Sequence, residues 1–375
     1  MKIRFRTGPI PNLRSAVFAW SILAGAIAMV AHTAMADTKF DKPSSGLINP
    51  RAIAFSPATG KVYAVDTSHG AVQIYNDALR QSSHMKVGAE PVSIAVNEIN
   101  GRVYVANAGD GTVTVLDGSS DAVVATVPVG SHPYSIAANA TTGKVYVTHT
   151  FGDELSILDG ATNTVTQLKT GSHDLIAINE RTDTIYLLGY EGGTVSVVDG
   201  VHQTVRLREA GKHAWGLTLN EGTGTIYATR IETAEVSALG DESPVAATLA
   251  AGAIPCAIAV NSKAGILYVA NYGDNTVSVI DANTGRSRDT VRVGAHPKGI
   301  AFDANRKLVY VANTSSASVT VIDAENSDVL ATLPAGKNPY ALAVVPGSAR
   351  LYVANEADDA PFTVVDVSEV RKQRQ

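Results

Sequence analysis

The stretch Val103-Tyr104-Val105-Ala106-Asn107 decides the fold of this 375-residue chain, because copies of it recur along almost the whole sequence. Every copy holds a tyrosine at its second position, and successive tyrosines are 40 to 42 residues apart. These tyrosines are Tyr63, Tyr104, Tyr146, Tyr186, Tyr227, Tyr268, Tyr310 and Tyr352. A unit of about 40 to 50 residues that is rich in short strands is typical of one blade of a β-propeller.

Each unit contains four short runs of strand-forming residues. In the clearest copy these runs are 92–97, 103–107, 112–117 and 123–127, and Gly, Asn, Asp or Pro separate them. A lone four-stranded sheet cannot bury two apolar faces, so the units must pack face to face around an axis. The sequence therefore predicts an all-β propeller of four-stranded blades.

A glycine before the first run of every unit indicates the number of blades. The glycines are Gly46, Gly88, Gly130, Gly171, Gly211, Gly252, Gly294 and Gly336. They predict eight blades, with an open ring or seven blades and one stray unit as the alternatives. The last unit lacks a fourth run after residues 362–366, and residues 37–45 precede Gly46 as an outer strand would. We therefore expect this N-terminal strand to close the ring.

The first 36 residues have the features of an export signal. They contain four basic residues, Lys2, Arg4, Arg6 and Arg14. An apolar stretch at 16–30 and the cleavage pattern Ala34-Met35-Ala36 follow. We expect cleavage after Ala36 and a periplasmic or secreted single domain of residues 37–375 without a membrane span. An uncleaved membrane anchor is the alternative.

Charge and cysteine content narrow the function classes. Removing the four basic residues of the signal from 30 Lys and Arg leaves 26, against 35 Asp and Glu. A nucleic-acid partner is not supported, because such partners normally require a basic patch. The single cysteine, Cys256, cannot form an internal disulfide and is interpreted as a small buried hydrophobic residue.

The chain resembles the YVTN family of β-propeller repeat proteins, in particular its exported YncE-like branch. The resemblance rests on Val-Tyr-Val-Ala-Asn, Thr-Val-Thr-Val-Leu-Asp and Gly-x-x-Pro motifs and extends over residues 46–366. It implies an extracytoplasmic scaffold, usually without assigned catalysis. Related propellers include lactonases, and more distant ones carry copper clusters or modified haems. No catalytic residues can be transferred, because the repeated residues of the family build the blades.

Repeated polar residues are interpreted as structural. An aspartate ends the third strand in six units: Asp117, Asp159, Asp199, Asp281, Asp323 and Asp366. We expect its carboxylate to accept backbone N–H bonds in the following turn, because a catalytic acid is not needed six times. The second-strand asparagines, such as Asn107, are predicted to form turns in the same way, and the tyrosines to pack between blades.

Departures from the repeat gather in units three to five. His149, Gly189 and Arg230 replace the second-strand asparagine, and Asp174 and Ala214 replace the proline of Gly-x-x-Pro. The loops that carry these positions open on the same face of a propeller, so we expect one binding surface there. Its predicted residues are His132, Tyr134, His149, His173, Asp174, Tyr190, His213, Trp215 and Arg230.

Two functions remain open. We expect a non-catalytic binding or assembly scaffold without a cofactor, which binds a small polar ligand or a partner protein. The alternative is a metal-assisted hydrolase or lactonase, with zinc or copper held by His132, His173 and His213, and Asp174 or Glu191 as the base. The histidines also fit a plain loop role, in which they bond the loop backbone. No nucleophile elbow or phosphate loop is evident in the sequence.

Overall fold

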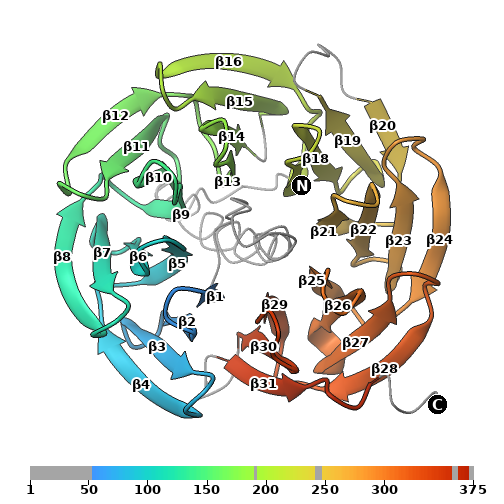
Figure 1. Ribbon diagram of the computed structural model, residues 1–375. Coiled ribbons are helices and arrows are strands. Elements are labelled where there is room, and N and C mark those ends of the chain that lie inside the picture. The colour runs from blue at the N-terminus through green and yellow to red at the C-terminus, as the bar shows by residue number, and fades with distance from the viewer. Residues whose placement is uncertain (1–52, 190–191, 241–246, 357–361, 371–375) are drawn as a thin grey trace, which may run out of the picture.

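The computed structural model describes residues 53–189, 192–240, 247–356 and 362–370. Their strands form eight antiparallel sheets, of which seven have four strands and the last has three. The sheets are blades around a central axis, and they follow one another around the ring in chain order (Figure 1). The eight-bladed propeller predicted from the sequence is therefore confirmed, and the seven-bladed alternative is wrong.

The strands of each blade run in order from the axis to the outside, and the blades are numbered 1 to 8 along the chain. The inner strands are β1 (Ile53–Ser56), β5 (Pro91–Val96), β9 (Pro133–Ala138), β13 (Leu175–Asn179), β17 (Ala214–Asn220), β21 (Pro255–Asn261), β25 (Pro297–Asp303) and β29 (Pro339–Val344). The second strands are β2 (Lys61–Asp66), β6 (Arg102–Asn107), β10 (Lys144–His149), β14 (Thr184–Leu188), β18 (Thr225–Arg230), β22 (Ile266–Asn271), β26 (Leu308–Asn313) and β30 (Arg350–Asn355).

The third strands are β3 (Ala71–Asn76), β7 (Thr112–Asp117), β11 (Glu154–Asp159), β15 (Thr194–Asp199), β19 (Glu235–Leu239), β23 (Thr276–Asp281), β27 (Ser318–Asp323) and β31 (Phe362–Asp366). The outer strands are β4 (Gln81–Lys86), β8 (Ala122–Pro128), β12 (Val165–Lys169), β16 (Thr204–Glu209), β20 (Ala247–Ala250), β24 (Ser287–Arg292) and β28 (Val329–Pro334).

The core lies between the blades. All six residues of β22 and of β26 are buried, because both faces of each sheet pack on neighbouring blades. This explains why the second strands are continuous apolar runs rather than alternating ones. The outer strands face solvent, and β4 consists almost entirely of exposed polar residues.

The repeated tyrosines pack between blades, as predicted. The Tyr63 hydroxyl donates to the carbonyl of Gly118 in the next blade at 3.3 Å, and the hydroxyl of Tyr268 donates to Ala324 at 3.2 Å. The ammonium of Lys61 also donates to the Gly118 carbonyl, at 2.8 Å. Each of these side chains therefore joins its blade to the next one.

The same type of contact closes the ring between blades 8 and 1. Strand β1 lies against β29 (Figure 1). Nη1 of Arg350 donates to the carbonyl of Asp77 at 2.7 Å and to its carboxylate, which also accepts a hydrogen bond from the Tyr352 hydroxyl. The ring of Tyr75 packs 5.6 Å from that of Tyr352 and 5.9 Å from that of Phe362. Side-chain packing thus joins the two ends of the repeat array.

The predicted closing strand at residues 37–45 and the signal at 1–36 lie outside the described residues. Within the described part of the chain, β31 has no outer neighbour. Val364 on β31 is 37% exposed, whereas Val115 and Val279 at the same position of four-stranded blades are 0% and 3% exposed. An apolar residue that is covered elsewhere is therefore uncovered at this edge.

The third-strand aspartates have the structural role that the sequence predicts. Oδ1 of Asp117 accepts the N–H groups of Ser119 and Ser120, both at 2.9 Å. At Asp199, the backbone N–H of His202 is the main cause of a pKa lowered to about 2. The same turn bonds form at Asp159, Asp281, Asp323 and Asp366.

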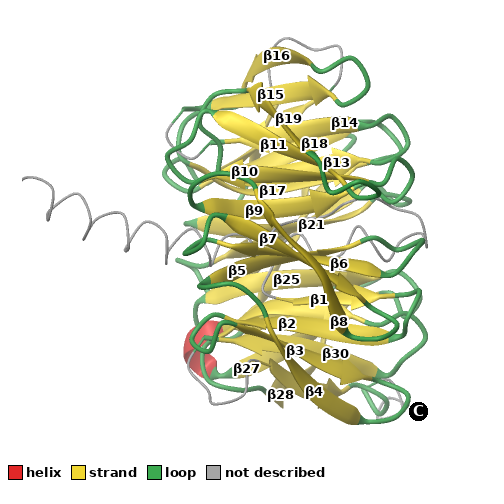
Figure 2. Cartoon of the chain, turned by 90° about the vertical axis from the view of Figure 1, so that its left-hand side faces the viewer, coloured by secondary structure: helices red, strands yellow, loops and turns green. Residues whose placement is uncertain are grey.

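The disc has two faces, seen edge-on in Figure 2. The upper face holds the loops that enter the inner strands and those that leave the second strands. The lower face holds the other two sets of turns. The short helix η2 (Thr314–Ser316) follows β26 and therefore lies on the upper face. This face is the left-hand side of the disc in Figure 2. None of the helices in the described residues is long and apolar enough to cross a membrane.

Candidate functional site

Two loops meet on the upper face through a recurring backbone hydrogen bond. The N–H after the second strand donates to the carbonyl of the residue at the third position of the Gly-x-x-Pro loop. Among the described residues, six blades have this bond, which joins Ala108 to Glu90, Thr150 to His132, Ile231 to His213, Tyr272 to Ile254, Thr314 to His296 and Glu356 to Asn338. The acceptor has a left-handed φ of 49° to 55° in all six. The backbone is therefore constant where the side chain varies.

We call this acceptor position and the position two places after the second strand the rim pair, and their side chains bond to each other in blades 5 and 7. In blade 5, Nδ1 of His213 lies 2.7 Å from Oε2 of Glu232. In blade 7, Nδ1 of His296 lies 2.7 Å from the Ser315 hydroxyl. The rim pair thus differs in charge and shape from blade to blade.

The rim pair of blade 3 consists of His132 and Phe151, and both residues are exposed. Phe151 is the most exposed large apolar side chain of the described residues, at 73%, and its φ is 63°. A bulky residue rarely adopts this left-handed conformation. Sequence reasoning missed Phe151, although it replaces the glycine of the Asn-x-Gly loops of blades 2 and 6.

His149 is buried and forms bonds inside blade 3. Its Nδ1 lies 2.9 Å from the Ser131 carbonyl, and its Nε2 lies 2.6 Å from the Ser156 hydroxyl. Burial lowers the pKa of His149. In blade 6 the amide of Asn271 donates to the Ser278 hydroxyl at 2.9 Å in the same place. The asparagine side chains thus bind third-strand hydroxyls rather than the turn, and His149 substitutes for one of them.

In blade 4 the position of His149 and Asn271 is occupied by Gly189, which has no side chain, so another residue supplies the polar contact. The buried ring of His173 points to the carbonyl of Thr170, with Nε2 at 2.6 Å, and Ser196 donates to the same carbonyl at 2.8 Å. Burial lowers the pKa of His173. The half-buried Asp174 donates its N–H to the Leu188 carbonyl at 3.0 Å. The side chain of His173 therefore belongs to the interior of the blade.

The other predicted residues of the upper face differ in how deeply they are buried. Tyr134 is buried, and burial, followed by the charge of Asp174, raises its pKa. Trp215 is half-buried at the start of β17. Arg230 forms an ion pair of 3.1 Å with Glu235. Tyr190 and the alternative base Glu191 lie outside the described residues.

No metal site forms from the predicted histidines. Within residues 53–189, 192–240, 247–356 and 362–370, no group of three His, Cys, Asp or Glu side chains could hold a metal ion. The alternative set of His132, His173 and His213 is therefore not brought together. The physical reason is that His173 turns into its blade, whereas His213 faces Glu232.

Cys256 is buried, as expected, and its thiol contacts the Pro297 carbonyl at 3.1 Å. Burial raises its pKa to about 12. The thiolate that nucleophilic chemistry requires is therefore suppressed.

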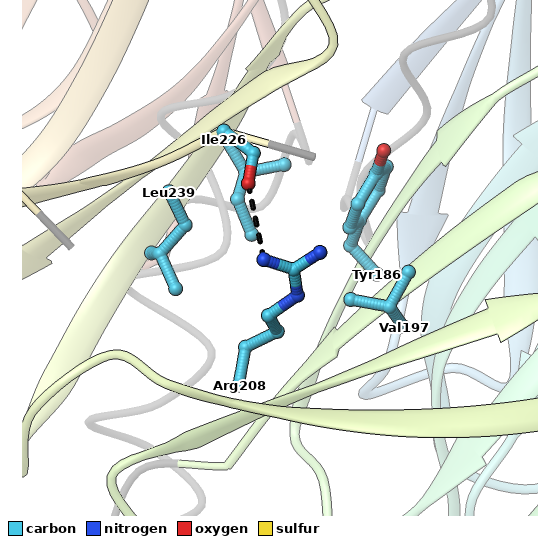
Figure 3. A pocket seen from close by; sticks show the side chains of 6 residues that line it. Tyr186, Val197, Arg208, Ile226 and Leu239 are labelled. Atoms are coloured by element: carbon cyan, nitrogen blue, oxygen red, sulfur yellow. Dashed lines mark hydrogen bonds between the residues drawn. The ribbon is translucent and has the colours of Figure 1, made fainter. Parts of the chain in front are cut away.

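A small cavity lies between blades 4 and 5, and none of the predicted residues lines it (Figure 3). Tyr186, Val197, Ile226 and Leu239 surround the guanidinium of Arg208, which donates to the Gly240 carbonyl at 3.3 Å. The cavity has a volume of about 10 Å³. That is room for about one water molecule, which is too little for a substrate.

The repeats, the ring and the upper-face loops define a β-propeller, and the comparisons agree. Residues 228–359 match the model of the family described as YNCE-like beta-propeller, which confirms the resemblance over these residues. No curated protein matches the chain significantly.

Solved structures share the fold at low sequence identity. Hydrazine synthase of Kuenenia stuttgartiensis is 17% identical, with a TM-score of 0.57 over 75% of this chain and 97% of that chain. The dihydro-heme d1 dehydrogenase NirN, in complex with DHE, is 14% identical, with a TM-score of 0.66 over 78% of this chain and 67% of that chain. Sqt1 of Saccharomyces cerevisiae is 12% identical, with a TM-score of 0.69 over 89% of this chain and 99% of that chain. These similarities show the fold alone.

Proposed function

We propose that this protein is an exported, non-catalytic scaffold that binds a partner protein through its upper face over blades 3 to 5. The observation that carries the proposal is the rim pair. A constant backbone bond holds it in blade after blade, while its side chains change from His132 and Phe151 to His213 and Glu232. Rigid loops with variable side chains are typical of recognition surfaces.

The bonding of the polar residues supports a scaffold rather than an enzyme. His149 binds Ser156 of its own blade, His173 binds the Thr170 carbonyl directly after the outer strand of blade 3, and burial lowers the pKa of both rings. A general acid or base must instead reach a substrate. A protein partner is favoured over a small ligand, because the rim of blade 3 exposes the large apolar side chain of Phe151, and exposed aromatic residues are typical of protein interfaces.

Export is proposed from the first 36 residues. The basic start, the apolar stretch at 16–30 and the Ala34-Met35-Ala36 pattern support cleavage and a periplasmic or secreted location. The resemblance to the exported YncE-like branch supports the same location.

The test compares two triple variants in the host cell. The rim variant carries His132→Ala, Phe151→Ala and His213→Ala. The control carries Leu79→Ala, Ile99→Ala and Val201→Ala, which remove comparably exposed side chains from the lower face. Size-exclusion chromatography of the extracytoplasmic fraction measures whether each protein elutes in a complex larger than the purified protein.

We expect the unaltered protein and the control to elute in the complex, and the rim variant to elute alone, because only the rim variant loses partner contacts. The proposal fails if the unaltered protein itself elutes alone, or if both variants behave alike.

A further inference from the structure

Phe151 gives the upper face an apolar point of contact. Its ring is exposed, and Phe151 is the second position of the rim pair of blade 3. The exposed residues Asp153 and Glu154 follow it in the chain after Gly152. Aromatic side chains at such positions supply much of the binding energy of protein interfaces. A partner that covers Phe151 must therefore also face carboxylates.

The upper face around Phe151 is strongly acidic. In blades 2 to 6, the described residues of the upper-face loops carry six carboxylates and one ammonium group. The carboxylates are those of Glu90, Asp110, Asp153, Asp174, Glu232 and Asp274, and the ammonium is that of Lys212. Lys169, at the end of β12, lies 3.7 Å from Asp153 and offsets its charge, which leaves five carboxylates against Lys212.

This charge selects the class of partner. Phosphate groups of nucleic acids or anionic lipids would be repelled, whereas Lys and Arg side chains would be attracted. Electrostatic complementarity of this kind accelerates association and excludes partners of the wrong charge.

We infer that the upper face over blades 3 to 5, with the acidic loops of blades 2 and 6 at its borders, binds a basic, amphipathic segment of a partner protein. An apolar residue of that segment covers Phe151, and its Lys or Arg residues face the carboxylates of the loops. The inference rests on the proposed function and adds the chemistry of the partner to it.

The experiment uses the purified mature chain and two fluorescein-labelled peptides. One is an amphipathic peptide of Lys and Leu, and the other has Glu in place of every Lys. Fluorescence anisotropy gives their dissociation constants at low salt and at about 0.5 M salt, where charge attraction is screened. We expect the Lys peptide to bind, to weaken with salt, and to bind at least about tenfold more tightly than the Glu peptide.

Matched variants separate the two parts of the surface. We expect Phe151→Ala to weaken binding of the Lys peptide by roughly tenfold, and Ile99→Ala, an equally exposed residue on the lower face, to leave it unchanged. The pair Asp153→Asn and Glu232→Gln should reduce the salt dependence, while the lower-face pair Glu325→Gln and Asp328→Asn should not.

The inference is overturned if the two peptides bind equally, if Phe151→Ala and Ile99→Ala have the same effect, or if anionic lipid vesicles bind more tightly than the Lys peptide. In those cases the rim variant still decides the proposed function separately. Its loss of the cellular complex would mean that the partner is not a basic segment, and its retention would mean that the surface itself is wrong.

Discussion

Replacing Asp77 by alanine tests how the ring closes. The Asp77 carboxylate accepts bonds from Arg350 and from the buried hydroxyl of Tyr352, while the Asp77 carbonyl keeps its own 2.7 Å bond to Arg350. Losing the partner of a buried hydroxyl costs about 1–3 kcal/mol. The ion pair adds about 1 kcal/mol or less, because both side chains are partly exposed, at 17% and 23%. We therefore expect Asp77→Ala to lose about 1–4 kcal/mol of unfolding free energy.

Asp121→Asn is the control, because asparagine, unlike alanine, readily adopts the left-handed φ of 56° at this position. The Asp121 carboxylate pairs with Lys61 at 2.8 Å between blades 1 and 2, and Lys61 keeps its bond to the Gly118 carbonyl after the change. We expect a loss of about 1 kcal/mol or less.

Urea unfolding and thermal melting of the purified mature protein measure both losses. For a domain of roughly 340 residues, 1 kcal/mol corresponds to about 1.5 °C, so Asp77→Ala should melt about 1.5–6 °C lower. If Asp77→Ala is no more destabilising than Asp121→Asn, the ring does not close through Asp77, Arg350 and Tyr352 as described.

Three further predictions concern the histidines, the sheet edge and metal. Burial lowers the pKa values of His149 and His173 below the unfolded value of about 6.5, so stability is full above about pH 6.5 and is lost as the pH falls through the lowered folded values. His149→Asn replaces the imidazole by the amide that the repeat carries at this position, facing Ser156. The variant should lose less melting temperature than the unaltered protein between pH 7.5 and pH 5, and an equal loss would count against this assignment. Deleting residues 37–45 behind the intact signal should lower the melting temperature by several degrees, because these residues are predicted to cover Val364 on β31, and equal melting of the two proteins would refute that pairing. Elemental analysis of the mature protein should find far less than one zinc or copper per chain, with no change in His173→Ala, and a stoichiometric metal would restore the enzyme alternative.

The fold could be predicted in detail because its signal repeats. The spacing of Tyr63, Tyr104 and the later tyrosines places one buried residue in every second strand, and a constant period leaves only a ring of equal blades. The repeats also place the loops that form the upper face. The repeat could not establish whether residues 37–45 form the outer strand of the last blade, because their strand pattern is weak.

The candidate site was predictable in position but not in detail. Counting along the repeat places His149 and His173 on upper-face loops, but it cannot show that both rings turn inward to Ser156 and Thr170. That orientation depends on the third strand and on the preceding outer strand of the neighbouring blade. Phe151 and Glu232 were missed because they lie two residues beyond the position at which departures from asparagine were sought.

The central claim is that the upper face binds the partner, and photo-crosslinking in intact cells tests it most directly. A photoreactive phenylalanine analogue is placed at position 151 on the upper face in one strain and at position 99 on the lower face in another. Both positions are strongly exposed, at 73% and 71%, so the reactive group is equally accessible in the free protein. The account predicts a discrete protein adduct from position 151 and none from position 99. An adduct from position 99 alone, or the same adducts from both positions, would contradict it.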